Sequence, residues 1–385
     1  MTGHIRRRGA NSWEIKFDVG TDPLTGRRRT RYATFKGTKR AAEVELARLV
    51  AQHAAGEGVD PTKATLRDFL DRWERDWAAT NVSPKTLERY KQLLRLYVDP
   101  YMGAFRIQKL RAVHLNELYA TLMRSGGSRS ATLAPRTVGH VHRVLHRALG
   151  HAATWGVIGQ NVASLVSPPR VPDAEIQIIS EEQIGVLLRH LEGRSLRPIV
   201  SFLLGTGARR GEALALRWAD VDFHKSTIRI ERSLEQTKGS LRIKSPKTKH
   251  GRRTVTISRW LAAELKAHRA RQDERRLALG LGGAPDDSPV FARWNGEFRD
   301  PNRLSQDFGT MMEDLGMDCT LHGLRHTHVS QLIASGLDVL TISRRIGHAS
   351  PAITLSVYGH MFANTDARAA EVLDATFAKI GGSTD

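Results

Sequence analysis

The chain has 385 residues, 40% of them hydrophobic, which is enough for a sizeable core and more than one domain. Its formal net charge of +19 indicates a polyanionic partner, with nucleic acid as the default. No apolar run approaches the roughly 20 residues that span a bilayer, the basic start lacks the apolar core of a secretory signal, and the single Cys319 excludes an internal disulfide.

A small basic module is predicted at the N-terminus. Residues 1–40 carry eleven lysines and arginines against three acidic residues. The stretch "SWEIKFDVG" alternates apolar and polar residues like a half-buried strand, and "RRRTRYATF" is a second extended segment. Thr38 is placed to cap a following helix. We therefore expect a small β-sheet-plus-helix domain over 1–60, followed by a Gly/Pro-marked linker.

The next segment is helical throughout. From Leu66 to about Ser164 apolar residues recur at helical spacing, as in "TLRDFLDRWERDW". Ser83 is a cap and Pro84 is a first helical residue. The helix in "APRTVGHVHRVLHRALGH" presents arginines and histidines on its polar face. These patterns predict an all-α domain over 64–168 with basic faces.

A mixed domain is expected over 175–385. The linker "SPPRVPDAE" precedes it, and "SEEQ" is a capping box that opens its first helix. "SFLLGTGARRGEALALRWADVDF" is predicted to be helical, and "STIRIERS" and "SLRIKSPKTKHGRRTVTIS" to form short strands with turns. Helices follow to the end. The fold class is thus multidomain α+β, with a mainly α last domain that contains a small antiparallel sheet.

Several routes to nucleic-acid chemistry have no motif here. There is no GxxxxGKS/T for ATP, and one cysteine cannot supply a Cys/His pair with zinc spacing. Asp286 and Asp287 form an acidic pair in a loop without an obvious partner for two magnesium ions. We therefore expect no cofactor and no metal, and chemistry that rests on Arg, Lys, His and Tyr.

Three segments carry residues of that kind. In "HGLRH", His322 and Arg325 stand three apart and can meet one oxyanion, whereas His326 and His328 are expected to point elsewhere. In "TGARRGE", a carboxylate three residues after an arginine can orient its guanidinium for phosphate contact. In "GHASPAITLSVYGH", a tyrosine follows a Gly-His turn by ten residues. Taken alone, each segment also has a purely structural interpretation. The histidines of the first can be hydrogen-bonded core residues, the Arg–Glu pair of the second a surface ion pair, and the tyrosine of the third a residue at the edge of the core.

Taken together, these residues resemble the catalytic set of the tyrosine recombinase (phage integrase) family, in its mobile-element branch. The set, in chain order, is Arg209, Glu212, His322, Arg325, His348 and Tyr358. The resemblance covers about residues 175–365. The helical segment resembles the family's core-site DNA-binding domain, and the N-terminal module resembles the arm-type DNA-binding domain of many integrases.

The resemblance implies a site-specific recombinase that cuts DNA through a 3′-phosphotyrosyl intermediate. Tyr358 matches the nucleophile, Arg209 and Arg325 the pair that holds the non-bridging oxygens, and Glu212 the acidic support of the first arginine. The histidines His322 and His348 match positions that hydrogen-bond the phosphate. The general acid is a hairpin lysine, and in "IKSPKTKHGRRTVTI" the expected residue is Lys247, with Lys244 and Lys249 as the other candidates.

The implied partners are double-stranded DNA attachment sites and three further copies of the chain in a homo-tetramer on DNA. An excisionase or a DNA-bending protein is a possible accessory protein. We expect no membrane partner and a cytoplasmic, nucleoid-associated location. A chromosome-dimer-resolving recombinase, a type IB topoisomerase and a catalytically silent DNA-binding regulator are the alternatives. The apolar stripe in "ARAAEVLDATFAKI" is consistent with docking on its own domain or on a neighbouring protomer.

Overall fold

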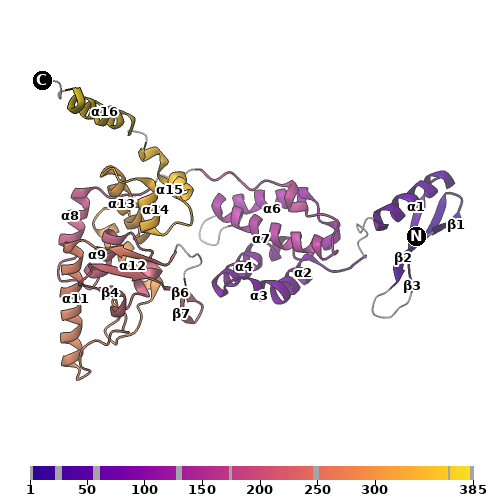
Figure 1. Ribbon diagram of the computed structural model, residues 1–385. Helices are drawn as coiled ribbons and strands as arrows, with labels where there is room; N and C mark the ends of the chain where they lie inside the picture. The colour runs from indigo at the N-terminus through magenta and orange to yellow at the C-terminus, as the bar shows by residue number, and fades with distance from the viewer. Residues whose placement is uncertain are drawn as a thin grey trace. The chain divides into compact units, whose positions relative to one another are not determined.

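The computed structural model describes residues 3–21, 28–54, 61–126, 132–172, 176–245, 251–362 and 365–381. The chain divides into two units, Met1–Asp173 and Ala174–Asp385 (Figure 1).

The first unit begins with a three-stranded antiparallel sheet in the order β1 (Gly3–Gly9), β2 (Ser12–Thr21), β3 (Arg28–Lys36). Ile15 and Phe17 of β2 are buried, as the alternation of apolar residues predicts. Helix α1 (Lys39–Ala54) follows, and the Thr38 hydroxyl accepts from the Ala41 backbone N–H at 3.3 Å. The strand β1 was not predicted, because an edge strand rich in arginine pairs through its backbone and needs no apolar alternation.

The rest of the first unit is helical. Its elements are α2 (Leu66–Trp73), the π-helical turn η1 (Glu74–Ala78), α3 (Ala79–Asn81), α4 (Pro84–Tyr97), α5 (Asp99–Met102), η2 (Ile107–Lys109), α6 (Ala112–Ser125), α7 (Pro135–Thr154) and η3 (Val162–Leu165). One face of α2 is buried, as its helical spacing predicts. The predicted cap at α4 is also present, since the Ser83 hydroxyl accepts from the Thr86 backbone N–H.

The second unit is mainly helical with two small antiparallel sheets. Its helices are α8 (Glu181–His190), α9 (Arg197–Thr206), α10 (Arg210–Leu214), η4 (Trp218–Asp220), α11 (Arg259–Ala278), α12 (Pro301–Asp314), α13 (Leu321–Ala334), α14 (Val339–Ile346), α15 (Pro351–Tyr358), η6 (Gly359–Phe362) and α16 (Thr365–Gly381). Its strands are β4 (Val221–Asp222), β5 (Thr227–Ile230), β6 (Ser233–Thr237), β7 (Ser240–Lys244) and β8 (Arg253–Thr256). The sheets have the orders β4-β5-β8 and β6-β7.

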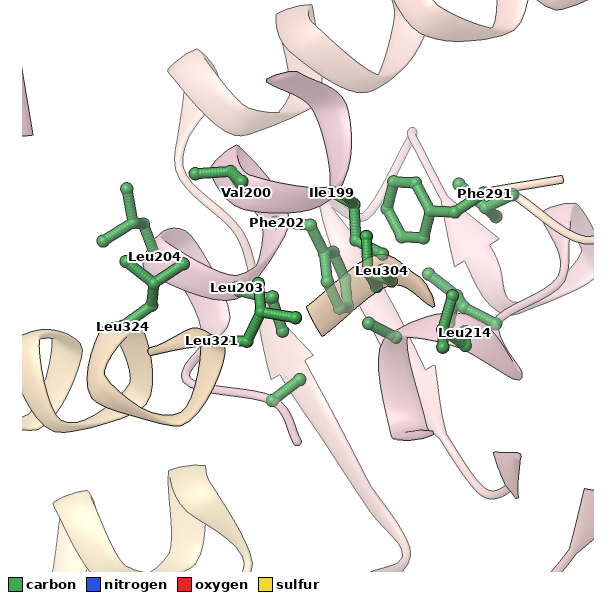
Figure 2. Close-up of a cluster of buried hydrophobic side chains, with 14 of the residues drawn as sticks. Ile199, Val200, Phe202, Leu203, Leu204, Leu214, Phe291, Leu304, Leu321 and Leu324 are labelled. Atoms are coloured by element: carbon green, nitrogen blue, oxygen red, sulfur yellow. The ribbon is translucent and has the colours of Figure 1, made fainter. Parts of the chain in front are cut away.

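The core of this unit is built around α9, which is apolar on nearly every side (Figure 2). Phe202 and Leu203 are fully buried, and they pack in one cluster with Leu304 of α12 and Leu324 of α13. Burying each such side chain contributes about 1.5–3 kcal/mol. The cluster therefore holds α10 and α13, which carry the candidate site residues, rigidly against one central helix.

The predicted helix through "SFLLGTGARRGEALALRWADVDF" is interrupted, which corrects the sequence-based expectation. Gly207 ends α9 in the left-handed conformation, with φ of 62°. A Cβ there would lie 2.7 Å from Cδ2 of His328, so only glycine fits this approach to α13. The break frees the Gly207 carbonyl and starts α10 in a new direction.

The prediction that "IKSPKTKHGRRTVTI" forms one hairpin is also wrong. Strand β7 pairs with β6, whereas β8 pairs with β5, so the two halves of this segment belong to different sheets. Residues 246–250, which include Lys247 and Lys249, lie outside the described residues.

Helix α16 carries exposed apolar side chains. Val372, Leu373 and Phe377 are each more than half exposed. Among the described residues, no helix has the length and apolar character needed to cross a membrane.

Candidate active site

The first arginine of the candidate site is positioned by a carboxylate three residues away. Glu212 accepts a hydrogen bond from the Arg209 backbone N–H at 2.9 Å and from its Nη1 at 2.8 Å. Nη2 of Arg209 donates to the Gly347 carbonyl at 3.3 Å. Glu212 is buried, whereas the Arg209 side chain is 43% exposed. Arg209 is therefore held from one side and can reach a ligand from the other.

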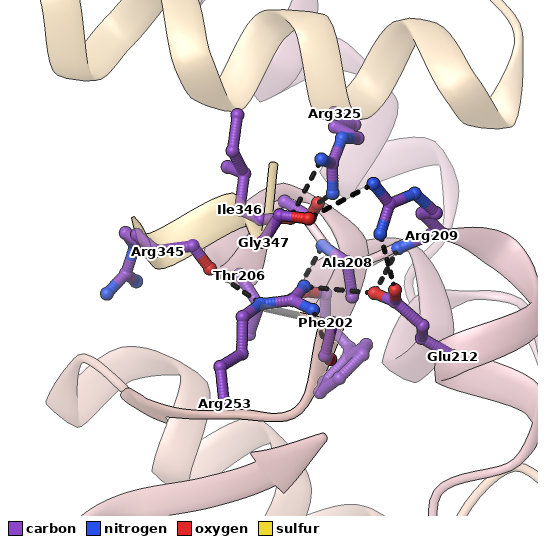
Figure 3. A network of polar contacts seen from close by, with 12 residues as sticks. Phe202, Thr206, Ala208, Arg209, Glu212, Arg253, Arg325, Arg345, Ile346 and Gly347 are labelled. Carbon is purple, nitrogen blue, oxygen red and sulfur yellow. Dashed lines mark hydrogen bonds and ion pairs between the residues drawn. The ribbon is translucent and has the colours of Figure 1, made fainter. Parts of the chain in front are cut away.

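A second arginine, Arg253, shares the same carboxylate. Its Nη2 donates to Oε2 of Glu212 at 2.9 Å, and its Nε donates to the Arg345 carbonyl at 2.7 Å (Figure 3). Burial alone would raise the pKa of Glu212, but the charges and hydrogen bonds of Arg253 and Arg209 hold it below its usual value. Arg253 was missed in the sequence, because it lies on β8, far along the chain from Glu212.

Arg325 is buried between two backbone carbonyls. Its Nη1 donates to the Gly207 carbonyl at 2.6 Å and its Nη2 to the Ile346 carbonyl at 2.8 Å (Figure 3). Burial, together with repulsion from Arg209, lowers the pKa of Arg325 to about 9, so its guanidinium stays charged at neutral pH. The break at Gly207 supplies one of the two carbonyls that orient it.

Two histidines line the cavity beside these arginines. Burial is the main reason that the pKa of His322 and that of His348 fall to about 4, and repulsion from nearby arginines adds to it. Both rings are therefore neutral at neutral pH. Nδ1 of His348 lies 2.9 Å from the Thr354 hydroxyl, which fixes the orientation of its ring.

Tyr358 is 1% exposed, yet it lines the same cavity. Its hydroxyl lies 2.6 Å from Nδ1 of His326. Burial raises the pKa of Tyr358 to about 12, and the charge of Arg325 opposes this rise. The nearest hydrogen-bond partner of the tyrosine is thus a histidine that was expected to point elsewhere.

His326 should have been recognised, since it stands four residues after His322 and shares its helical face. The two ring centroids are 4.8 Å apart. His328, in contrast, points away as expected: its Nδ1 lies 2.7 Å from the Leu204 carbonyl, and its Nε2 accepts from Arg345. It supports the packing of α13 on α9.

These groups surround one cavity of about 570 Å³. It brings together Arg209, Glu212, His322, Arg325, His348 and Tyr358, which are the six matched residues of the catalytic set in the described part of the chain. Lys244, one of the alternative lysine candidates, also lines it, and His326 is the addition that the sequence did not predict. Lys244 pairs with Glu235. With Arg209, Arg253 and Arg325 against the carboxylate of Glu212, the site carries excess positive charge and is suited to an anion.

Removing the carboxylate is expected to destabilise the fold. The variant Glu212→Gln leaves the buried Arg253 without its counter-charge, which costs about 3 kcal/mol, the lower end for breaking a buried ion pair. Urea unfolding of the variant and the parent measures this loss. Because the folded-state pKa is lowered, the parent's extra stability is present above pH 4.5 and is lost as the pH falls through the lower folded value. A Glu212→Gln variant as stable as the parent at pH 7 would contradict this role of the carboxylate.

Comparison with known proteins agrees with the fold. Residues 177–365 match the phage integrase family, and residues 65–123 match the phage integrase N-terminal SAM-like domain. The "tyrosine recombinase XerC-like" protein of Caldanaerobacter subterraneus subsp. tengcongensis is 27% identical over 88% of this chain and 90% of its own length. The ICEBs1 integrase of Bacillus subtilis is 24% identical over 96% of this chain and 99% of its own length.

A solved structure of the Tn1549 transposon integrase in complex with transposon right end DNA shares the fold. It has a TM-score of 0.65 at 22% identity and covers 80% of this chain and 99% of that one. The fold is that of the tyrosine recombinase class. The chain belongs to the phage integrase family.

Proposed function

We propose that the protein is a site-specific DNA recombinase that integrates or excises a mobile element. The observation that carries the proposal is the single cavity in which Arg209, Arg325, His322 and His348 surround the buried tyrosine. Relatives over nearly the full chain, such as the ICEBs1 integrase, support the mobile-element role.

In the proposed reaction, the hydroxyl oxygen of Tyr358 attacks a backbone phosphorus of DNA. A bond forms between that oxygen and phosphorus, and the bond from phosphorus to the 5′-oxygen of the next sugar breaks. The products are a 3′-phosphotyrosyl link and a free 5′-hydroxyl. Attack by a 5′-hydroxyl from another strand reverses the step, so no energy source is consumed.

The two site arginines are assigned to the non-bridging oxygens. The pentacovalent state carries two negative charges, and preorganised guanidiniums stabilise charge that develops there. Arg325 is oriented by two carbonyls and Arg209 by a carboxylate, so neither has to reorganise during the reaction. Neutral His322 and His348 are assigned as hydrogen-bond partners of the phosphate.

His326 is assigned as the acceptor of the phenolic proton. Burial is the main reason that its pKa is lowered from 6.5, and Arg325 adds to the effect, so the ring is neutral and able to accept a proton. Its Nδ1 is already at hydrogen-bond distance from the hydroxyl. For the departing 5′-oxygen, Lys247 is assigned as the proton donor.

The variant His326→Asn tests this assignment, because asparagine can keep a hydrogen bond near Nδ1 but cannot take up the proton. Single-turnover cleavage is expected to fall by about 10²–10⁴-fold, the usual contribution of a general base. In the parent, cleavage should decline as the pH falls below 6.5 through the lowered pKa of His326, and this decline should be absent in the variant. A variant that keeps the parent's pH profile would show that the contact is only structural.

We further propose that the protein acts as a homo-tetramer on two DNA duplexes in the cytoplasm, associated with the nucleoid. The tetramer of lambda integrase bound to a Holliday junction, which shares the fold, supports this assembly. The exposed apolar side chains of α16 provide a surface for contact with a neighbouring protomer or with its own unit.

A plasmid assay tests the function as a whole. Two copies of the attachment site, taken from the junctions of the element that carries the gene, are placed on a supercoiled plasmid with the purified protein. We expect deletion or inversion of the intervening DNA only when both sites are present. Relaxation of plasmids without sites would instead indicate a topoisomerase, and binding without any strand exchange or cleavage would indicate a regulator.

A further inference from the structure

A second cavity in the unit Ala174–Asp385 is lined by arginines. It has a volume of about 620 Å³ and shares no lining residue with the cavity around Tyr358. The arginine pocket, as we call it, lies between α11, the start of α12 and the two connections before α9 and α12. Its arginines are Arg194, Arg271, Arg275, Arg276, Arg293, Arg299 and Arg303.

The charge of the arginine pocket is not balanced by its own acids. Seven guanidiniums face two lining carboxylates, Asp300 and Asp307, and Arg293 also pairs with Glu297 at 3.8 Å. Asp307 pairs with Arg303 at 2.8 Å, and Asp300 accepts hydrogen bonds from the first backbone N–H groups of α12. Both acids are therefore committed to local partners, and the pocket keeps a strong positive charge.

Several of these guanidiniums have donors to spare. Arg194, Arg271 and Arg275 make no side-chain hydrogen bond or ion pair with any residue in the described part of the chain. Arg299 is half-buried and donates only to two backbone carbonyls, those of Ala292 and Ser195, both at 3.3 Å. Since carbonyls do not neutralise a buried charge, an anion at this position would offset the cost of burying it.

The shape and the lining indicate the class of ligand. A volume of this size is typical of small-molecule sites, and guanidiniums bind phosphate oxygens in a bidentate manner. Trp294 lines the same pocket and is 80% exposed, so its ring is free to stack on a base. A duplex presents its phosphates on a convex surface, which reaches a half-buried guanidinium such as Arg299 less well than a free phosphate chain does.

We propose that the arginine pocket is a second anion site of this chain, which takes a nucleoside polyphosphate through its phosphate chain and its base. The site is independent of the reaction at Tyr358. It provides a place where a small phosphate-bearing ligand binds to the unit that carries the cleavage site.

Calorimetric titration of the full chain with ATP and with inorganic tripolyphosphate, in the absence of DNA, tests the proposal. The double variant Arg271→Ala/Arg275→Ala removes two exposed side chains of the pocket, and so the fold is retained. The matched control Arg259→Ala/Lys266→Ala removes the same charge from the same helix outside the pocket. Affinity for both ligands is expected to fall at least about 10-fold in the pocket variant, since each charge-assisted hydrogen bond is worth that much.

The variant Trp294→Ala separates the two parts of the ligand. It should weaken ATP binding and leave tripolyphosphate binding unchanged. Absence of binding, or an equal loss in the control variant, would refute a built site and indicate only general attraction to a basic protein. Loss of duplex-DNA affinity in the pocket variant without any binding of ATP or tripolyphosphate would also overturn the proposal and assign the arginines to DNA.

Discussion

Replacing Arg325 with lysine is expected to slow DNA cleavage by about 10³-fold, the upper range for removing one preorganised donor from an anion site. The guanidinium donates to the Gly207 and Ile346 carbonyls with two of its nitrogens and keeps its remaining edge for the phosphate. An ammonium group carries the same charge but cannot hold two carbonyls and also contact two oxygens in a fixed plane. Retained charge should therefore not rescue the rate.

The control for this experiment is Arg210→Lys. Arg210 is also a partly buried arginine that donates to a backbone carbonyl, that of Pro301 at 2.8 Å, but it does not line the cavity around Tyr358. Single-turnover cleavage of a nicked core-site duplex should be nearly unchanged in this control. A folded Arg325→Lys variant that cleaves within about tenfold of the parent, equivalent to 1.4 kcal/mol, would remove Arg325 from the proposed role.

The variant Tyr358→Phe is expected to lose cleavage completely while binding DNA nearly as well as the parent. The substitution removes only the hydroxyl, whose partner in the structure is Nδ1 of His326. Losing that hydrogen bond costs about 1 kcal/mol of stability, too little to unfold the protein. A gel-shift titration and a cleavage assay on the same DNA measure the two properties side by side.

Tyr90→Phe is the matched control for the loss of a hydrogen-bonded phenol. The Tyr90 hydroxyl accepts from Nη1 of Arg147 at 3.0 Å in the helical part of the first unit. This variant should cleave like the parent. Cleavage that persists in Tyr358→Phe would mean that another group attacks the phosphate.

Local spacing explains which parts of the site were predictable. The Arg209–Glu212 pair is joined by a capping interaction within one turn, and the spacing of His322 and Arg325 puts them on one helical face, so short-range geometry determines both. The alternation in β2 and the apolar face of α2 were predictable for the same reason. These features depend only on residues that are near each other in the chain.

Residues that reach the site from distant elements were not predictable in this way. Arg253 shares the Glu212 carboxylate only because β8 is brought beside it by the fold, where β8 pairs with β5, and no spacing in the sequence encodes that contact. The break at Gly207 depends on how closely the chain approaches His328, which is a property of the packed core. His326 differs from these residues, because its four-residue spacing from His322 is visible in the sequence and places both rings on one face of the helix.

The most direct test of phosphotyrosyl cleavage is to locate the protein–DNA bond. A duplex nicked close to the cleavage position traps the covalent product, because the short 5′-ended fragment diffuses away and cannot reverse the step. After protease digestion, mass spectrometry should find a nucleotide linked through a 3′-phosphate to the peptide that contains Tyr358. An adduct on any other residue, or a cut strand with no protein attached, would contradict the proposed reaction.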